Sequence, residues 1–210
     1  MNGRILFAVS FITIAIVAII ATVAWTSLTV QRGLRKGDWI TYSHNVLYQG
    51  WTVEPDLELD WFRIDVLDVD NNIVSFNLTS HLINGTEAIQ SCKLDLSNGN
   101  MNCSNTWSYD PPFMREANLF ILPNLRTGDS IPSMPGYHVR QEQNQIYSGT
   151  NRTVIWTKDE GGLTYAPRGA YTYYESYFFW DKQSGIFVEW QFWNTGSKQQ
   201  YFKILETNIW

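Results

Sequence analysis

The sequence has few of the residues that enzymes commonly use for catalysis and metal binding. Its 210 residues include only three histidines, His44, His81 and His138, and two cysteines. None of the histidines stands in the H-x-x-x-H or H-E-x-x-H spacing of a metal site. The chain also lacks a G-x-S-x-G turn and a phosphate-binding glycine loop. We therefore expect a protein that is not an enzyme and that needs no metal or other cofactor.

Positive charge is scarce as well. Lys and Arg number 15 against 20 Asp and Glu, which gives a formal net charge of −5. Contacts to nucleic-acid phosphates need clustered Lys or Arg, and the sequence contains no such basic stripe. We expect no nucleic-acid partner.

Charge is missing altogether from one long segment near the N-terminus. Residues 5–30 form an uncharged run of 26 residues, long enough as a helix to cross a hydrocarbon core of about 30 Å. This predicts a transmembrane anchor over residues 1–30. A signal peptide cleaved after Ala24 is the alternative, because Thr22-Val23-Ala24 is an acceptable cleavage site. Its apolar region would normally be only about 7–15 residues, which favours a retained anchor.

Several sequence features bear on the side of the membrane where residues 31–210 lie. Arg32, Arg35 and Lys36 after the anchor favour a cytoplasmic domain by the positive-inside rule, but long domains cross largely regardless of flanking charge. Two closely spaced cysteines and four N-x-S/T sequons favour the outside. The sequons begin at Asn77, Asn84, Asn102 and Asn151. We expect a single-pass membrane protein with a linker at 31–37 and an extracytoplasmic domain at 38–210.

Beyond residue 38 the sequence is typical of β-strands. Short runs of β-branched and aromatic residues alternate with turn sequences such as Asn-Gly and Pro-Pro. Strands are expected at 39–48, 57–69, 73–82, 86–95, 101–107, 137–147, 152–158, 171–180, 186–193 and 199–207, with one short helix at 112–122. Strands joined by short turns predict a mainly β fold: an antiparallel curved sheet, as a half-barrel or sandwich.

Two hairpins can be assigned a register. A turn at Asn71-Asn72 places Val69 opposite Val74 and Leu67 opposite Phe76, and directs Asn77 outward. A second turn, at residues 97–98, brings Cys92 opposite Cys103, so we expect a disulfide between them.

The C-terminal part is rich in aromatic residues, since 15 of the 32 in the chain fall in the last 46 positions. A hairpin over 171–193 would turn at Asp181–Gly185 and place Phe178, Trp180 and Trp190 on a core face. Its other face mixes rings with polar groups and is the candidate ligand-binding surface. The candidate residues are Tyr173, Glu175, Tyr177, Phe187, Glu189, Gln191 and Trp193. Glu175 and Glu189 are diagonal neighbours in this register and would be the acid and base if the face were catalytic.

Several segments together resemble a family of uncharacterised archaeal membrane-anchored surface proteins. They are GDWITY at 37–42, WFRIDVLDVDNN at 61–72, LTSHLINGTE at 78–87, LPNLRTGDSI at 122–131, YSGTNRTV at 147–154, FWDKQSGIFVEW at 179–190 and ILETNIW at 204–210. The resemblance implies an external β domain on an anchor, with an architecture like the half-barrels of lipoprotein carriers. It implies no catalytic residues.

Three functions agree with these features. The first is a binding or carrier domain for a lipid or other hydrophobic ligand. The second is a structural or adhesive subunit of the cell surface or of a filament, with a protein partner. The third is carbohydrate binding through exposed Trp and Tyr.

Overall fold

The computed structural model describes residues 33–48, 59–104, 119–165, 170–194 and 198–210. They form ten strands in one sheet, in which every neighbouring pair is antiparallel. The strands are β1 (Trp39–Tyr48), β2 (Leu59–Asp70), β3 (Ile73–Leu82), β4 (Glu87–Asp95), β5 (Met101–Cys103), β6 (Gln141–Tyr147), β7 (Thr150–Tyr165), β8 (Ala170–Asp181), β9 (Phe187–Asn194) and β10 (Lys198–Thr207). The mainly β, antiparallel fold expected from the sequence is confirmed.

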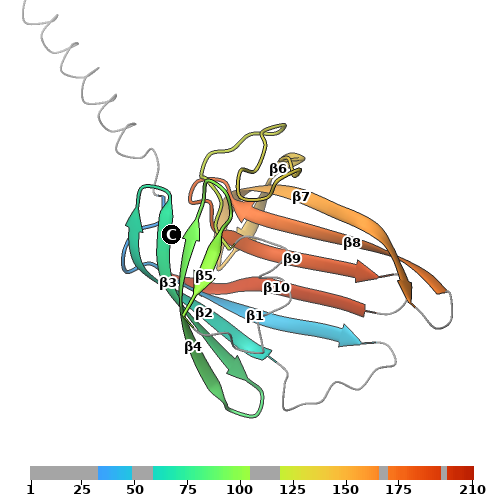
Figure 1. Ribbon diagram of the computed structural model, residues 1–210, viewed down its shortest axis with the longest axis horizontal. Coiled ribbons are helices and arrows are strands. Elements are labelled where there is room, and N and C mark those ends of the chain that lie inside the picture. Colours follow the sequence, from blue (N-terminus) through green and yellow to red (C-terminus); the bar gives the residue numbers. More distant parts are fainter. Residues whose placement is uncertain (1–32, 49–58, 105–118, 166–169, 195–197) are drawn as a thin grey trace, which may run out of the picture. The chain divides into compact units, whose positions relative to one another are not determined.

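The order in the sheet is β5-β4-β3-β2-β1-β10-β9-β8-β7-β6. The first and last strands of the chain therefore lie side by side at its centre, and each half of the domain builds one half of the sheet (Figure 1). Within the described residues there is no helix of the length and apolarity needed to cross a membrane. The anchor predicted at residues 5–30, and the cleavage site that is its alternative, lie outside them.

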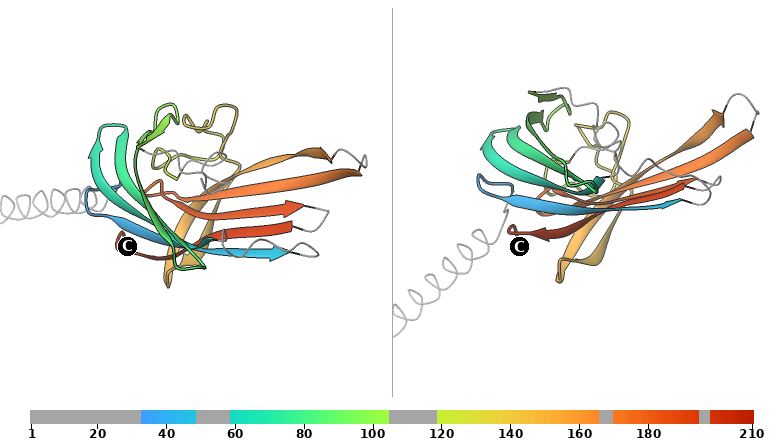
Figure 2. Two further views of the ribbon diagram at one scale, coloured as in Figure 1. Left: turned by 60° about the horizontal axis from the view of Figure 1, so that its bottom comes forward. Right: turned by 90° about the horizontal axis from the view of Figure 1, so that it is seen from below.

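The sheet is curved, so that it has an inner, concave face and an outer face. The strands β2–β5 turn away from the plane of β8–β10, as Figure 2 shows. Along β3, fully buried side chains alternate with less buried ones from Val74 to Leu82. This period of two is that of a strand with one face in the core, and the buried set lies on the inner face.

A continuous row of aromatic rings crosses the inner face from β8 to β2 and back. Successive rings lie 4.4–6.2 Å apart between centroids, a normal spacing for aromatic pairs. In order of contact they are Tyr174, Phe192, Trp190, Phe202, Phe62, Tyr42, Phe187, Trp180 and Phe178. Their buried polar atoms have partners. Trp190 Nε1 donates to Ser176 Oγ at 2.7 Å, and the Tyr42 hydroxyl donates to the Phe187 carbonyl at 2.7 Å. Much of the aromatic excess therefore serves the core.

The segment 119–140 covers one end of the inner face. The Phe120 ring packs edge-on against Phe76, and Phe120 forms a β-bridge with Ile186. The prediction of a helix over 112–122 is wrong for residues 119–122. The backbone groups of this segment bond to the β8–β9 turn and not, as in a helix, to the residue four positions earlier. The Ile121 amide, for example, donates to the Gly185 carbonyl. Gly185 has φ +74°, and a Cβ there would lie 2.1 Å from the Ile121 carbonyl oxygen, so only glycine fits.

The register expected for the β2–β3 hairpin holds only next to its turn. Val69 pairs with Val74 as expected, but a bulge follows at Leu67 and shifts the rest by one residue. Phe76 therefore pairs with Val66 instead of Leu67. The bulge directs Leu67 outward, where it is exposed, and it returns Val66 to the inner face. Asn77 lies on the outer face as expected.

The expected disulfide between Cys92 and Cys103 is confirmed. The two residues are direct partners in the β4–β5 pairing, and their sulfurs are bonded. Since β5 has only three residues and forms one edge of the sheet, the bridge fastens the shortest strand to the buried inner face.

Candidate functional site

Six of the seven candidate ligand-binding residues share the outer face of β8 and β9. Glu175 lies directly opposite Trp193, and Tyr177 lies opposite Gln191. This register differs by two residues from the expected one, and a shift of two leaves these six side chains on their expected face because the period of a strand is two. The six are Tyr173, Glu175, Tyr177, Glu189, Gln191 and Trp193.

The seventh candidate, Phe187, lies on the opposite face. A bulge at Val188 places Glu189 opposite Phe179 and Phe187 opposite Trp180, so the strand changes face between positions 189 and 187. The Phe187 ring is fully buried and contacts Trp180 edge-on at 6.0 Å. Phe187 therefore belongs to the core row.

Strand β7 supplies a charged cluster to the same outer face. Lys158 pairs with Tyr177, and Glu160 pairs with Glu175. The Lys158 ammonium bridges the two carboxylates, at 2.5 Å from Glu160 Oε2 and 2.7 Å from Glu175 Oε1. The Tyr173 hydroxyl donates to Glu160 Oε2 at 2.7 Å. Two like charges that would repel across the strands are thus held together by one cation.

These contacts shift the pKa values of the cluster in a consistent direction. The hydrogen bond from Lys158, followed by that from Tyr173, lowers the pKa of Glu160 below its ordinary 4.5. Hydrogen bonds to Glu160 and Glu175 raise the pKa of Lys158 above its ordinary value, and the bond to Glu160 raises that of Tyr173. The Glu160 carboxylate and the Lys158 ammonium therefore stay charged at neutral pH.

One end of this face is closed by the β6–β7 hairpin. The Tyr147 hydroxyl lies 2.7 Å from Glu189 Oε2, and Gln191 Nε2 donates to Glu189 Oε1 at 2.7 Å. Glu189 is only 7% exposed, and burial, then the Glu189 charge, raises the pKa of Tyr147. The Lys203 ammonium lies over the Tyr147 ring, 5.2 Å from its centroid.

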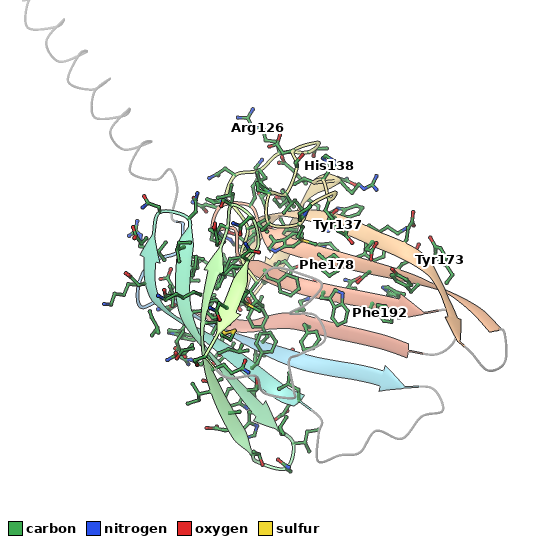
Figure 3. All side chains as sticks on the ribbon, in the orientation of Figure 1. Arg126, Tyr137, His138, Tyr173, Phe178 and Phe192 are labelled. Carbon is green, nitrogen blue, oxygen red and sulfur yellow. A yellow bond between two sulfur atoms is a disulfide. The ribbon has the colours of Figure 1, made fainter. Side chains whose placement is uncertain are left out.

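At the other end of the face two rings are partly exposed. Tyr173 and Trp193 are each 38% exposed, and Tyr173 lies near the end of β8 that is far from the β8–β9 turn (Figure 3). Glu175, Tyr177 and Gln191 between them are half-buried. We call the surface formed by Lys158, Glu160, Tyr173, Glu175, Tyr177, Gln191 and Trp193 the outer platform. It combines two exposed rings with hydrogen-bonding groups on one sheet face.

The register separates the two carboxylates that were considered as an acid and base. Glu175 lies opposite Trp193, four residues from Glu189 along β9, which corresponds to about 13 Å. Glycosidase carboxyl pairs lie about 5–9.5 Å apart. Each carboxylate also has its own donors, Lys158 for Glu175 and Tyr147 for Glu189.

The three histidines belong to different elements. His81, on β3, stacks on Trp61 and lies 3.5 Å from an Asp60 carboxylate oxygen, whereas His138 lies in the segment before β6, with Ser130 Oγ 3.3 Å from its Nδ1. His44 is on β1. Within the described ranges, no three His, Cys, Asp or Glu side chains cluster in a way that could hold a metal ion.

The four sequons are on the surface to different degrees. Asn84, Asn102 and Asn151 are exposed, on the β3–β4 turn, β5 and the start of β7. Asn77 is half-buried in the middle of the outer face of β3, and its Oδ1 accepts a hydrogen bond from Ser91. None of the four belongs to the outer platform.

Sequence reasoning missed Lys158, Glu160 and Tyr147. They precede the aromatic hairpin and reach it only because β7 pairs with β8 and the β6–β7 hairpin folds across β9. The alternation in Trp156-Thr-Lys158-Asp-Glu160, with Trp, Lys and Glu on one side, was the available signal for a further strand of the face.

No protein-family model and no curated protein matches the chain. Among solved structures, the chain is similar to a proposed exported protein with a YmcC-like fold from Bacteroides fragilis. The TM-score is 0.47 at 12% sequence identity, over 85% of this chain and 99% of the other. That neighbour is bacterial, and nothing in these comparisons supports the archaeal origin implied by the resemblance. A likeness of this degree carries no information on ligand or activity.

Proposed function

We propose that this protein is a non-enzymatic binding domain held at the outer side of a membrane, and that the outer platform binds a neutral carbohydrate. The observation that carries the proposal is the placement of Tyr173 and Trp193 beside hydrogen-bonded carboxylates on one sheet face. Five of the seven residues that the sequence predicts to bind a ligand belong to the platform, and Glu189 lies beside it on the same face.

The chemistry of the platform fits a sugar. Sugar rings have apolar C–H faces that pack on aromatic rings, and their hydroxyls bond to carboxylates and amides at the edges. Glu160, Glu175 and Gln191 provide such groups within one to two strands of Trp193. Because Lys158 offsets much of the carboxylate charge, a neutral ligand suits the surface better than an ion of either sign.

Affinity electrophoresis tests this function. The full-length protein in detergent is run through gels that contain mannan, soluble β-glucan or glycol chitin. The proposal expects at least one polysaccharide to retard the protein. Migration unchanged by all of them, with tight binding of a fluorescent fatty acid instead, contradicts it.

The external location has its own test. If the domain is anchored through residues 5–30 and lies outside, protease or a membrane-impermeant lysine reagent added to intact cells reaches it. Lys93 is exposed on the outer face of β4, and its labelling is a suitable readout. Labelling only after lysis would place the domain inside.

Transport of a hydrophobic ligand is a second candidate, and one observation favours it. Tyr174 and Phe192, which stack at 5.9 Å, continue the ring row of the inner face but are only half-buried, unlike Trp190 and Phe202. In this function an acyl chain would extend the row. Binding of the fluorescent fatty acid that is lost in Phe192→Ser but kept in Trp193→Ala would support it.

A further inference from the structure

A polar pocket lies at the opposite end of β8 from the outer platform. It has a volume of about 250 Å³ and is lined by polar residues of the β8–β9 turn, the start of β7 and the segment before β6. Asp181, in this pocket, is eight residues from Tyr173, or about 27 Å along the strand. The two sites are therefore separate.

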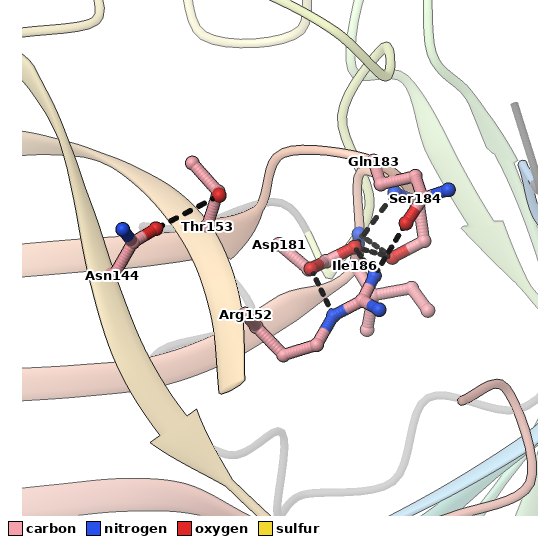
Figure 4. Close-up of polar contacts among 7 residues, drawn as sticks. All are labelled: Asn144, Arg152, Thr153, Asp181, Gln183, Ser184 and Ile186. Carbon is pink, nitrogen blue, oxygen red and sulfur yellow. Dashed lines mark hydrogen bonds and ion pairs between the residues drawn. The ribbon is translucent and has the colours of Figure 1, made fainter. Parts of the chain in front are cut away.

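The negative charge in this pocket is fully engaged. Arg152 forms a bidentate pair with Asp181, with Nε 2.8 Å from Oδ1 and Nη2 2.9 Å from Oδ2 (Figure 4). The Ser184 amide and hydroxyl both donate to Asp181 Oδ2, at 2.8 and 2.6 Å. The Asp181 carboxylate is 1% exposed and accepts four hydrogen bonds, so it offers nothing further to a ligand.

Several donor groups in the pocket can make further hydrogen bonds. Arg152 uses Nε and Nη2 for Asp181 and Gln183, while Nη1 makes no hydrogen bond to the described residues. Lys182 makes one ion pair, with Glu142. The Asn124 Nδ2 group is buried and has no hydrogen-bond partner among the described residues. A buried amide donor without a partner costs free energy that an acceptor in the pocket would recover.

The guanidinium is also held in place from its other side. The Arg152 Cζ atom lies 4.6 Å from the centroid of the Trp210 ring. Nη2 gives one N–H to Asp181 and the other to Gln183, so the donors that the fixed guanidinium has left are the two N–H groups of Nη1. They can bond to one oxygen of a ligand anion.

From this geometry we propose that the pocket binds a small hydroxylated carboxylate of the sugar-acid class. Arg152 and Lys182 hold the carboxylate, and Asn124 and Gln183 bond to ligand oxygens. The volume is below the range of about 300–1,000 Å³ for drug-sized ligands, which suits a single sugar ring. This site is independent of the proposed outer platform.

Isothermal titration calorimetry with glucuronate, glucose, acetate and sulfate tests the proposal. The full-length protein is made in a host that does not glycosylate, because Asn151 lines the pocket and a glycan there would cover it. We expect glucuronate to bind about tenfold or more tightly than each of the others, since glucose lacks the charge and the two small anions lack the ring. No glucuronate binding, or equal binding of glucose or sulfate, overturns the proposal.

Two variants locate the binding. Asn124→Asp replaces the buried donor by an acceptor of the same shape, and Lys182→Gln removes one charge. Each should weaken glucuronate about tenfold or more. Asn71→Asp is the matched control, because Asn71 also has positive φ (53° against 62°) but lies in the β2–β3 turn. All three should melt near the wild-type temperature. An equal loss in the control, or no loss in the two pocket variants, overturns the assignment.

Discussion

Two tryptophans three residues apart on β9 have opposite surroundings. Trp190 is 2% exposed, contacts Phe192 and Phe202 on the inner face, and donates its indole N–H to Ser176. Trp193 is 38% exposed and lies opposite Glu175 on the outer platform. One strand thus presents one ring to the core and another, partly exposed ring to the outer face. The inner face explains the stability of the fold, and the outer face is where we expect its function.

The largest effect is expected from the inner face. Trp190→Ala removes a buried aromatic from the middle of the ring row and should cost about 3–5 kcal/mol, a large share of a total of about 5–15. Urea denaturation followed by circular dichroism measures the loss. Trp190→Phe keeps most of the packing and should be milder. A loss of under about 1 kcal/mol for Trp190→Ala would contradict the account of the core.

The far edge of the inner face should show a smaller effect. Replacing Cys92 and Cys103 together by Ser removes a bridge across 11 positions and should cost about 2–3 kcal/mol, because the unfolded chain gains freedom. The same urea experiment on reduced wild-type protein is the control and should give a similar value. If the double variant is as stable as the oxidised protein, the bridge does not fasten β5.

Smaller still should be the effect of the outer ring on stability. Trp193→Ala leaves the core untouched and should change the free energy of unfolding by about 0.5–1 kcal/mol. A comparison with Trp190→Ala under the same conditions sharpens the contrast between the faces. Equal losses in both variants would show that both rings are core.

The charged cluster predicts a pH effect. The pKa of Glu160 is lowered, so its bonded carboxylate stabilises the domain above the ordinary 4.5, and this contribution is lost as pH falls through the lowered value. In ¹³C NMR titration, the Glu160 carboxyl should have a midpoint below 4.5, which returns towards 4.5 in Lys158→Met. The exposed, distant Lys93→Met is the control and should leave it unchanged. A wild-type midpoint at or above 4.5 would contradict the hydrogen bonds from Lys158 and Tyr173 to Glu160.

The local sequence pattern predicted the antiparallel fold and the sheet face on which most side chains lie. The residue-by-residue pairing of the strands was known only from the structure. Turn residues and alternation placed ten strands, and Asn71-Asn72 gave the right pairs nearest its turn. The bulges at Leu67 and Val188 were not predictable, because an extra residue in one strand is accommodated by packing across the sheet. The second bulge moved Phe187 from the expected site to the core.

The outer platform was predicted in part for a related reason. A two-residue slip in the β8–β9 register preserved the faces, so Tyr173 and Trp193 were placed correctly although their expected partners were wrong. Lys158 joins the site through the pairing of β7 with the next strand, β8. The strand expected from the sequence ended at residue 158, whereas β7 continues to Tyr165, so the pairing that brings Lys158 and Glu160 beside β8 was not predicted.

The most direct test of the central claim is polysaccharide binding by a platform variant that remains folded. Tyr173→Ala/Trp193→Ala removes both exposed rings, and Ile89→Ala, a 61% exposed residue on β4, is the matched control. With the polysaccharide that retards the wild-type protein most, we expect retardation to be lost in the double variant and kept in the control, with both melting close to wild type. Retardation that persists in the folded double variant would contradict the assignment of the outer platform.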